Sequence, residues 1–262
     1  MSAASAILSV LSGTLVGLSL GLIGGGGSIL AVPLMVYVVG LPPHAAIGTS
    51  AVAVAVSALA NLGGHARART VKWPCALVFA IAGVGGAAIG AQLGKRVDGQ
   101  ALLAAFGVLM IIVAGLMLRP RRVGHDPQVR LTRSSAVHLL PPLAGTGLAV
   151  GALSGFFGIG GGFLIVPGLI SATAMPLLNA IGSSLVSVSA FGATTAVSYA
   201  ASGLVAWRIA GLFILGGLAG GYAGIEAAKA LAGRKRMLAI VFSVVVAVVG
   251  LYVTARGIAR LI

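Results

Sequence analysis

Ten stretches of hydrophobic residues, separated by short polar or glycine-containing breaks, form the main pattern along the chain. Most of them are long enough, at about 20 residues, for a helix that crosses a lipid bilayer. They lie at about residues 5–23, 28–40, 45–63, 75–93, 101–118, 139–157, 163–174, 179–202, 208–228 and 237–256. This pattern predicts an all-α polytopic membrane protein.

Two of these stretches, residues 28–40 and 163–174, are too short to cross a bilayer as regular helices. Each follows a run of glycines and contains a proline, Pro33 or Pro167. Short segments interrupted by glycine and proline, at matching places in two halves of a transporter, are typical of broken helices at a binding site in the middle of the membrane. We therefore expect short, broken helices at both glycine runs.

The second half of the chain repeats the first with a shift of 134 residues, without a gap over most of its length. The glycine runs, Gly48 and Gly182, and Trp73 and Trp207 all fall in register. Internal repeats are a common construction in secondary transporters. We expect a first transmembrane repeat at residues 1–118, a basic cytoplasmic linker at 119–138 and a second repeat at 139–262.

Composition excludes a water-soluble domain, because only 8% of the 262 residues are charged and 59% are hydrophobic. The net charge of +14 does not indicate nucleic acid, since the basic residues cluster between the hydrophobic stretches without interleaved aromatic residues. Such clusters orient a membrane protein. Cys75 is the only cysteine, which excludes an intrachain disulfide.

The basic clusters bear on how the two repeats are oriented. If each repeat crosses the membrane five times, the repeats are inverted and 12 of the 17 Lys and Arg residues share one side. If the short segments do not cross, the repeats are parallel and the division is 11 to 6. The positive-inside rule favours the inverted arrangement, with both termini outside, by a small margin.

The two glycine runs are the first candidates for a binding site. Glycine lets irregular backbone approach a ligand, and the free N–H groups at a helix start attract anions. The alternative is close helix packing, which we expect instead for Gly17, Gly21, Gly83, Gly86, Gly90, Gly217, Gly220 and Gly224. The candidate glycines, together with the serine that ends the first run, are Gly24, Gly25, Gly26, Gly27, Ser28, Gly158, Gly160, Gly161 and Gly162.

Hydroxyl and amide side chains on the third stretch of each half are the second candidates. Thr49, Ser50, Ser183 and Ser184 could donate hydrogen bonds to an oxyanion, or cap the helix and bond back to its own carbonyls. Asn61 and its repeat equivalent Thr195 are expected to face the bundle interior. For this last pair, a hydrogen bond between helices is the alternative to substrate binding.

Catalytic and metal-binding patterns are not readable in the sequence. The four histidines lie at segment ends or in loops without ligand spacing, and Glu226 is the only acid inside a hydrophobic stretch. No carboxylate pair or Ser-His-Asp arrangement can be read from the spacing of these residues. We expect no enzyme activity, no cofactor and no bound metal.

Several of these motifs together resemble the sulfite exporter TauE/SafE family of membrane transporters. They are Gly24–Gly27 leading to Val32 and Pro33, the copy Gly158–Gly162 leading to Val166 and Pro167, the two Gly-hydroxyl motifs at 48–50 and 182–184, and Val71-Lys72-Trp73 with Val205-Ala206-Trp207. The similarity covers nearly the whole chain. The second copy has Ile159 within its glycine run and Ala206 in place of Lys72.

The resemblance implies a multi-pass permease of the inner membrane that exports a small sulfur-containing oxyanion, such as sulfite or a sulfonate. The expected partners are this anion and the lipid bilayer, without nucleic acid, and a homodimer is an open option. Two other functions remain open. One is a permease for a different small solute, and the other is a membrane scaffold that transports nothing.

Overall fold

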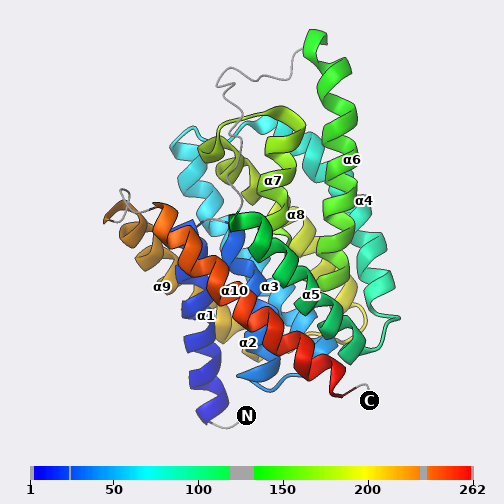
Figure 1. Ribbon diagram of the computed structural model, residues 1–262, viewed down its shortest axis with the longest axis vertical. Helices are drawn as coiled ribbons and strands as arrows, with labels where there is room; N and C mark the ends of the chain where they lie inside the picture. Colours follow the sequence, from blue (N-terminus) through cyan, green and yellow to red (C-terminus); the bar gives the residue numbers. More distant parts are fainter. Residues whose placement is uncertain (1–2, 24, 119–132, 231–234, 261–262) are drawn as a thin grey trace.

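The computed structural model describes residues 3–23, 25–118, 133–230 and 235–260, and these form a helical bundle without strands (Figure 1). The elements follow the predicted hydrophobic stretches. In order they are α1 (Ala3–Ile23), the 3₁₀ helix η1 (Gly25–Leu30), α2 (Ala31–Tyr37), α3 (Pro43–Arg67), α4 (Trp73–Gly94), α5 (Gly99–Leu118), α6 (Arg133–Phe157), α7 (Gly162–Thr173), α8 (Leu177–Ala200), α9 (Trp207–Ala230) and α10 (Lys235–Ile258).

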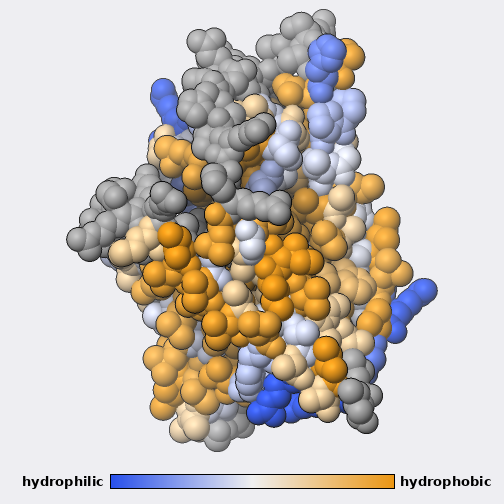
Figure 2. Space-filling view, in the orientation of Figure 1, coloured by the Kyte–Doolittle hydropathy of each residue, from blue (hydrophilic) through white to orange (hydrophobic). Residues whose placement is uncertain are grey.

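Eight of the described helices are long and hydrophobic enough to cross a membrane, namely α1, α3, α4, α5, α6, α8, α9 and α10. The two short segments after the glycine runs are the exceptions, as predicted. Many of the large hydrophobic side chains of the long helices are exposed, for example Ile81 and Leu215. Hydrophobic side chains cover the middle of the visible face, and hydrophilic ones gather toward its two ends (Figure 2). This is the surface of a multi-pass membrane protein.

Each half of the chain packs mainly against the other half. The most extensive contacts join α1 to α9, α4 to α6, α5 to α10 and α3 to α8. Under the shift of 134 residues, the first two pairs exchange with each other and the last two map onto themselves. The halves therefore form one interlocked body rather than two separate bundles.

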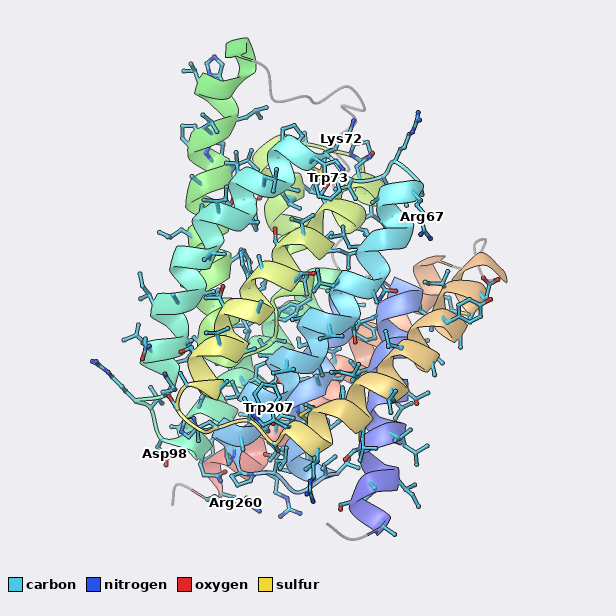
Figure 3. All side chains as sticks on the ribbon, turned by 180° about the vertical axis from the view of Figure 1, so that it is seen from behind. Arg67, Lys72, Trp73, Asp98, Trp207 and Arg260 are labelled. Atoms are coloured by element: carbon cyan, nitrogen blue, oxygen red, sulfur yellow. The ribbon has the colours of Figure 1, made fainter. Side chains whose placement is uncertain are left out.

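Repeat-equivalent positions lie at opposite ends of this body. Trp73 lies with Arg67 and Lys72 at one end, and Trp207 lies near the other end with Asp98 and Arg260 (Figure 3). The short helices follow the same rule, since α2 lies toward the end that carries the N-terminus and α7 toward the opposite end (Figure 1).

In the α1–α9 and α4–α6 contacts, glycines let the two helix backbones touch. A Cβ at Gly17 would overlap the carbonyl oxygen of Gly217 in α9, and a Cβ at Gly86 would overlap the carbonyl oxygen of Leu148 in α6. Positions 21, 83, 90, 220 and 224 are equally closed, and a Cβ at Gly217 would lie 3.2 Å from Ser57 Oγ. The packing interpretation of these eight glycines is confirmed.

Candidate functional site

The second glycine run lies between the two halves of the chain, at the contact of α3 with α8. A Cβ at Gly160 would lie 2.7 Å from Val54 Cγ1 and 3.2 Å from Val188 Cγ1, and these two valines are repeat equivalents. A Cβ at Gly158 would overlap Ile47 of α3. All the residues from Gly158 to Gly162 are buried. The backbone at this point therefore fits only glycine.

Three glycines of this run take left-handed backbone conformations. The φ angles are +68° at Gly158, +65° at Gly160 and +68° at Gly161, and Gly161 is the N-cap of α7. The chain thus turns sharply from the end of α6 into the start of α7 inside the bundle. Since the first N–H groups of a helix have no partner within it, this buried helix start is suited to hold an anion.

The first glycine run takes a different shape. Residues Gly25 and Gly26 belong to the 3₁₀ helix η1, and Gly24 lies outside the described residues. Gly27 and Ser28 are buried, and a Cβ at Gly27 would lie 2.5 Å from the backbone nitrogen of Leu20. η1 contacts α7, the short helix that follows the second glycine run.

Thr49 and Ser183 hold the loops of the opposite half, an arrangement that the sequence analysis missed. The backbone N–H of Ala206 donates to Thr49 Oγ1 at 3.0 Å, and the backbone N–H of Lys72 donates to Ser183 Oγ at 2.9 Å. Both hydroxyl groups are fully buried. We call these two hydrogen bonds the loop clasps. The sequence contains one sign of this arrangement. Thr49 and Ser183 occupy equivalent positions in the two repeats, and so do Lys72 and Ala206, which precede the two tryptophans.

The glycines beside the clasps make room for the same loops. A Cβ at Gly48 would overlap the carbonyl oxygen of Leu204, and a Cβ at Gly182 would lie 2.6 Å from Thr70 Oγ1. Asn179 Nδ2 adds a hydrogen bond of 2.9 Å to the carbonyl oxygen of Thr70. The Gly-hydroxyl motif of each half thus packs against, and hydrogen-bonds to, the loop of the other half.

The second hydroxyls of the same motifs bond back to their own helices. Ser50 Oγ donates to the carbonyl oxygen of Ile47 at 3.0 Å, and Ser184 Oγ donates to that of Ile181 at 2.8 Å. Ser50 Oγ also lies 3.3 Å from the carbonyl oxygen of Gly158, which it ties to α3. The back-bonding interpretation is confirmed for both serines, and Ser50 joins the predicted hydroxyl motif to the glycine run.

Asn61 and Thr195 are repeat equivalents with different surroundings. Asn61 is half-buried, and its amide lies 3.9 Å from the position of a Cβ on Gly221 in α9. Thr195 is fully buried, and its Oγ1 has no hydrogen-bond partner within the described part of the chain. The interhelical hydrogen bond that was the alternative for Thr195 is therefore not formed.

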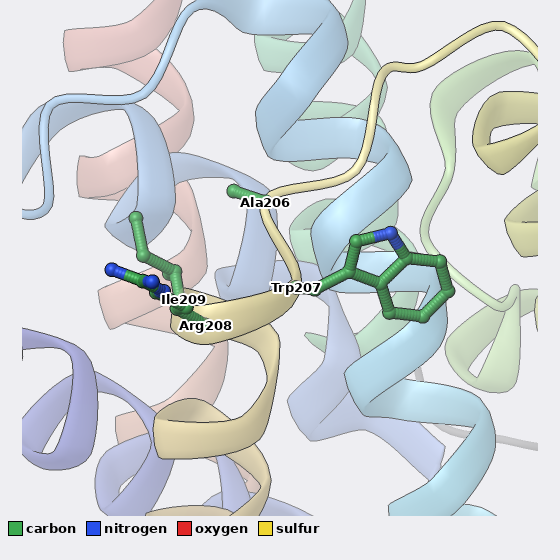
Figure 4. A pocket seen from close by; sticks show the side chains of 4 residues that line it. All are labelled: Ala206, Trp207, Arg208 and Ile209. Carbon is green, nitrogen blue, oxygen red and sulfur yellow. The ribbon is translucent and has the colours of Figure 1, made fainter.

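A shallow pocket of about 410 Å³ lies beside the clasp at Ala206 and is lined by Ala206, Trp207, Arg208 and Ile209. The side chains of Trp207 and Arg208 point to opposite sides of the chain (Figure 4). This pocket opens at one end of the bundle and is not lined by the glycine run. Among the residues that the structure describes, no group of three or more His, Cys, Asp or Glu residues could hold a metal ion.

Comparison with known proteins gives consistent results. The profile of the family described as Sulfite exporter TauE/SafE matches residues 9–253. A probable membrane transporter protein of Xylella fastidiosa, strain Temecula1, is 50% identical over the full length of both chains, and its counterpart in strain 9a5c is 49% identical over the same extent. The probable membrane transporter protein YunE of Bacillus subtilis is 28% identical over 97% of this chain and 99% of its own. No solved structure matches the chain.

Proposed function

Because the chain belongs to the sulfite exporter TauE/SafE family, whose matched members are named membrane transporters, we propose that it exports a small sulfur-containing oxyanion such as sulfite or a sulfonate. The path runs between the two halves, through the second glycine run. The observation that carries this proposal is the buried start of α7, where Gly158, Gly160 and Gly161 take left-handed conformations between α3 and α8.

The chemistry of this helix start suits an oxyanion. Backbone N–H groups at the first turn of α7 and the positive end of the helix dipole favour negative charge. Removal from water strengthens these interactions. A neutral solute gains nothing from the dipole, so the same geometry disfavours the alternative of a neutral metabolite.

We infer that the two halves are inverted in the membrane. In support, Trp73 and Trp207 lie at opposite ends of the body, although they are repeat equivalents. The described start of α6, which follows the linker at 119–132 in the sequence, lies toward the same end as Arg67 and Lys72 (Figures 1 and 3). Since that linker carries four arginines, the positive-inside rule places this end in the cytoplasm.

Export of an anion in this orientation needs no second ion. A membrane potential drives anions outward with about 2.3 kcal/mol per charge per 100 mV. Proton coupling through the membrane would need a titratable side chain in the path, and Glu226 lies exposed on α9 instead. We therefore expect a voltage-driven facilitator.

A flux measurement with purified protein in liposomes tests this function. Radiolabelled sulfite, sulfate, thiosulfate, sulfoacetate and a small dicarboxylate are compared, with empty liposomes as the control. We expect saturable flux of a sulfur oxyanion. An inside-negative potential should increase the rate of its efflux. Flux of the dicarboxylate alone would assign a different substrate, and no flux of any of these anions would favour a scaffold.

The energy source is tested in the same liposomes. Efflux should follow an imposed voltage, and the substitution Glu226→Gln should leave it unchanged. An efflux that follows a pH gradient, ignores voltage and disappears in the Glu226→Gln variant would instead make Glu226 a coupling residue.

A further inference from the structure

One buried hydroxyl beside the second glycine run lacks the hydrogen bond that most hydroxyls in these helices make. Ser9, Thr14, Ser189 and Thr254, for example, each donate to the carbonyl oxygen four residues earlier. Ser154 of α6 is fully buried, and its Oγ has no partner within the described part of the chain. A buried hydroxyl without a partner costs about 1–3 kcal/mol, so such a group calls for a function.

Ser154 faces the start of α7. Its Oγ lies 3.0 Å, and its Cβ 2.9 Å, from the position that a Cβ on Gly161 would take. Gly161 is the N-cap of α7 and has a left-handed backbone conformation. The carbonyl oxygen of Ser154 also accepts the N–H of Ile159 at 3.2 Å, which fixes the backbone of α6 against the glycine run. The unpartnered hydroxyl and the anion-attracting helix start are therefore neighbours.

The first half of the chain has a serine near the matching glycine, but its hydroxyl is already bonded: Ser19 Cβ lies 2.8 Å from the position of a Cβ on Gly27, and Ser19 Oγ donates to the carbonyl oxygen of Leu15 at 2.9 Å. The repeat equivalent of Ser154 is Leu20, and that of Gly161 is Gly27. These two residues are also in contact, since a Cβ at Gly27 would lie 2.5 Å from the Leu20 nitrogen, and Leu20 is buried. The hydroxyl beside the glycine is thus bonded to its own helix in the first half and has no partner within the described residues in the second.

We propose that Ser154 Oγ donates a hydrogen bond to the transported oxyanion at the start of α7, so that the second half of the chain supplies the polar side of the binding site. This inference rests on the proposed function, because it names a further residue of the same site. The hydroxyl supplies the donor, while the N-cap region of α7 supplies the positive potential.

The substitution Ser154→Ala tests this role, with the KM for sulfite flux in liposomes and the melting temperature in detergent as the two readouts. We expect KM to rise at least about tenfold, as the loss of a hydrogen bond to a charge implies. The melting temperature should stay unchanged or rise, since no hydrogen bond within the protein is lost. Ser154→Cys keeps only a weak donor and should give an intermediate KM.

The matched control is Ser189→Ala, which removes a buried serine hydroxyl that bonds back to Leu185. It should leave KM for sulfite unchanged. A KM of the Ser154→Ala variant within about twofold of wild type, with wild-type flux normal, would overturn this inference alone. An absence of flux of any tested oxyanion by the wild-type protein would overturn the proposed function, and this inference with it.

Discussion

The two halves of the chain share a frame, by which we mean their helix contacts and loop clasps. They differ in the side chains and backbone turns packed inside it. In each half a left-handed residue follows the second long helix, Arg69 (φ +54°) after α3 and Gly203 (φ +69°) after α8. Each half then seats the following loop on a hydroxyl of the opposite half, through the loop clasps at Thr49 and Ser183. The frame is thus repeated even in single hydrogen bonds and backbone angles.

The interior is not repeated. Ser57 faces Gly217 in one half, whereas its equivalent Phe191 fills the space over Gly83 in the other and stacks on Phe79 with 6.2 Å between ring centroids. One glycine run forms a 3₁₀ helix and the other turns through left-handed glycines. A duplicated chain can therefore keep its helix contacts while the interiors of its two halves differ.

The largest difference between the halves should appear on truncating this equivalent pair. Phe191→Ala opens a cavity in the core and should lower the free energy of unfolding by about 3–5 kcal/mol. Ser57→Ala removes one oxygen and should change it by less than about 1 kcal/mol. Unfolding titrations in detergent measure both, and equal losses would contradict the asymmetric interior.

A smaller loss is expected at the turn that only the second half makes. Gly160→Ala adds a strained φ and a Cβ only 2.7 Å from Val54 Cγ1, so we expect a loss of about 2–5 kcal/mol and no transport. Gly203→Ala is the control, because its φ is +69° but nothing lies within 4 Å of the new Cβ. It should lose only about 1–2 kcal/mol and keep its flux.

Breaking the loop clasps probes what the halves have in common. Thr49→Val and Ser183→Ala each leave a backbone N–H without its acceptor, and each should lower the free energy of unfolding by about 1–3 kcal/mol. The clasps lie far apart, so the losses in the double variant should add. A loss at one clasp only would show that the frame is not shared.

The smallest effect is expected at the start of α5, where Asp98 accepts the N–H groups of Gln100 at 2.8 Å and Ala101 at 3.1 Å. The bonds from the Ala101 and Gln100 N–H groups lower the pKa of Asp98 below 3.8. The stability it contributes is therefore present above that pH and lost as the pH falls through the lower folded pKa. In the Asp98→Ala variant, the melting temperature should fall less as the pH is lowered into this range. An unchanged pH dependence would exclude a stabilising role for the Asp98 carboxylate at the start of α5.

The sequence predicted the helices well, because long hydrophobic stretches and glycine spacing act locally. It also predicted short helices at both glycine runs, which the structure has as η1 with α2 and as α7. It did not predict the loop clasps or the position of Ser154. Both depend on which residues of the two halves meet, and a repeat comparison hides Ser154 because its equivalent is Leu20.

The central claim is that the two halves are inverted in the membrane around one site, and labelling of repeat-equivalent cysteines tests it most directly. Ala68→Cys and Ser202→Cys, each in a Cys75→Ala background, place one thiol in the equivalent exposed loop of each half. An impermeant thiol reagent added to intact cells or to inverted vesicles reports the side of each residue. The account predicts labelling of residue 202 from outside and of residue 68 from the cytoplasmic side. Labelling of both residues from the same side would contradict it.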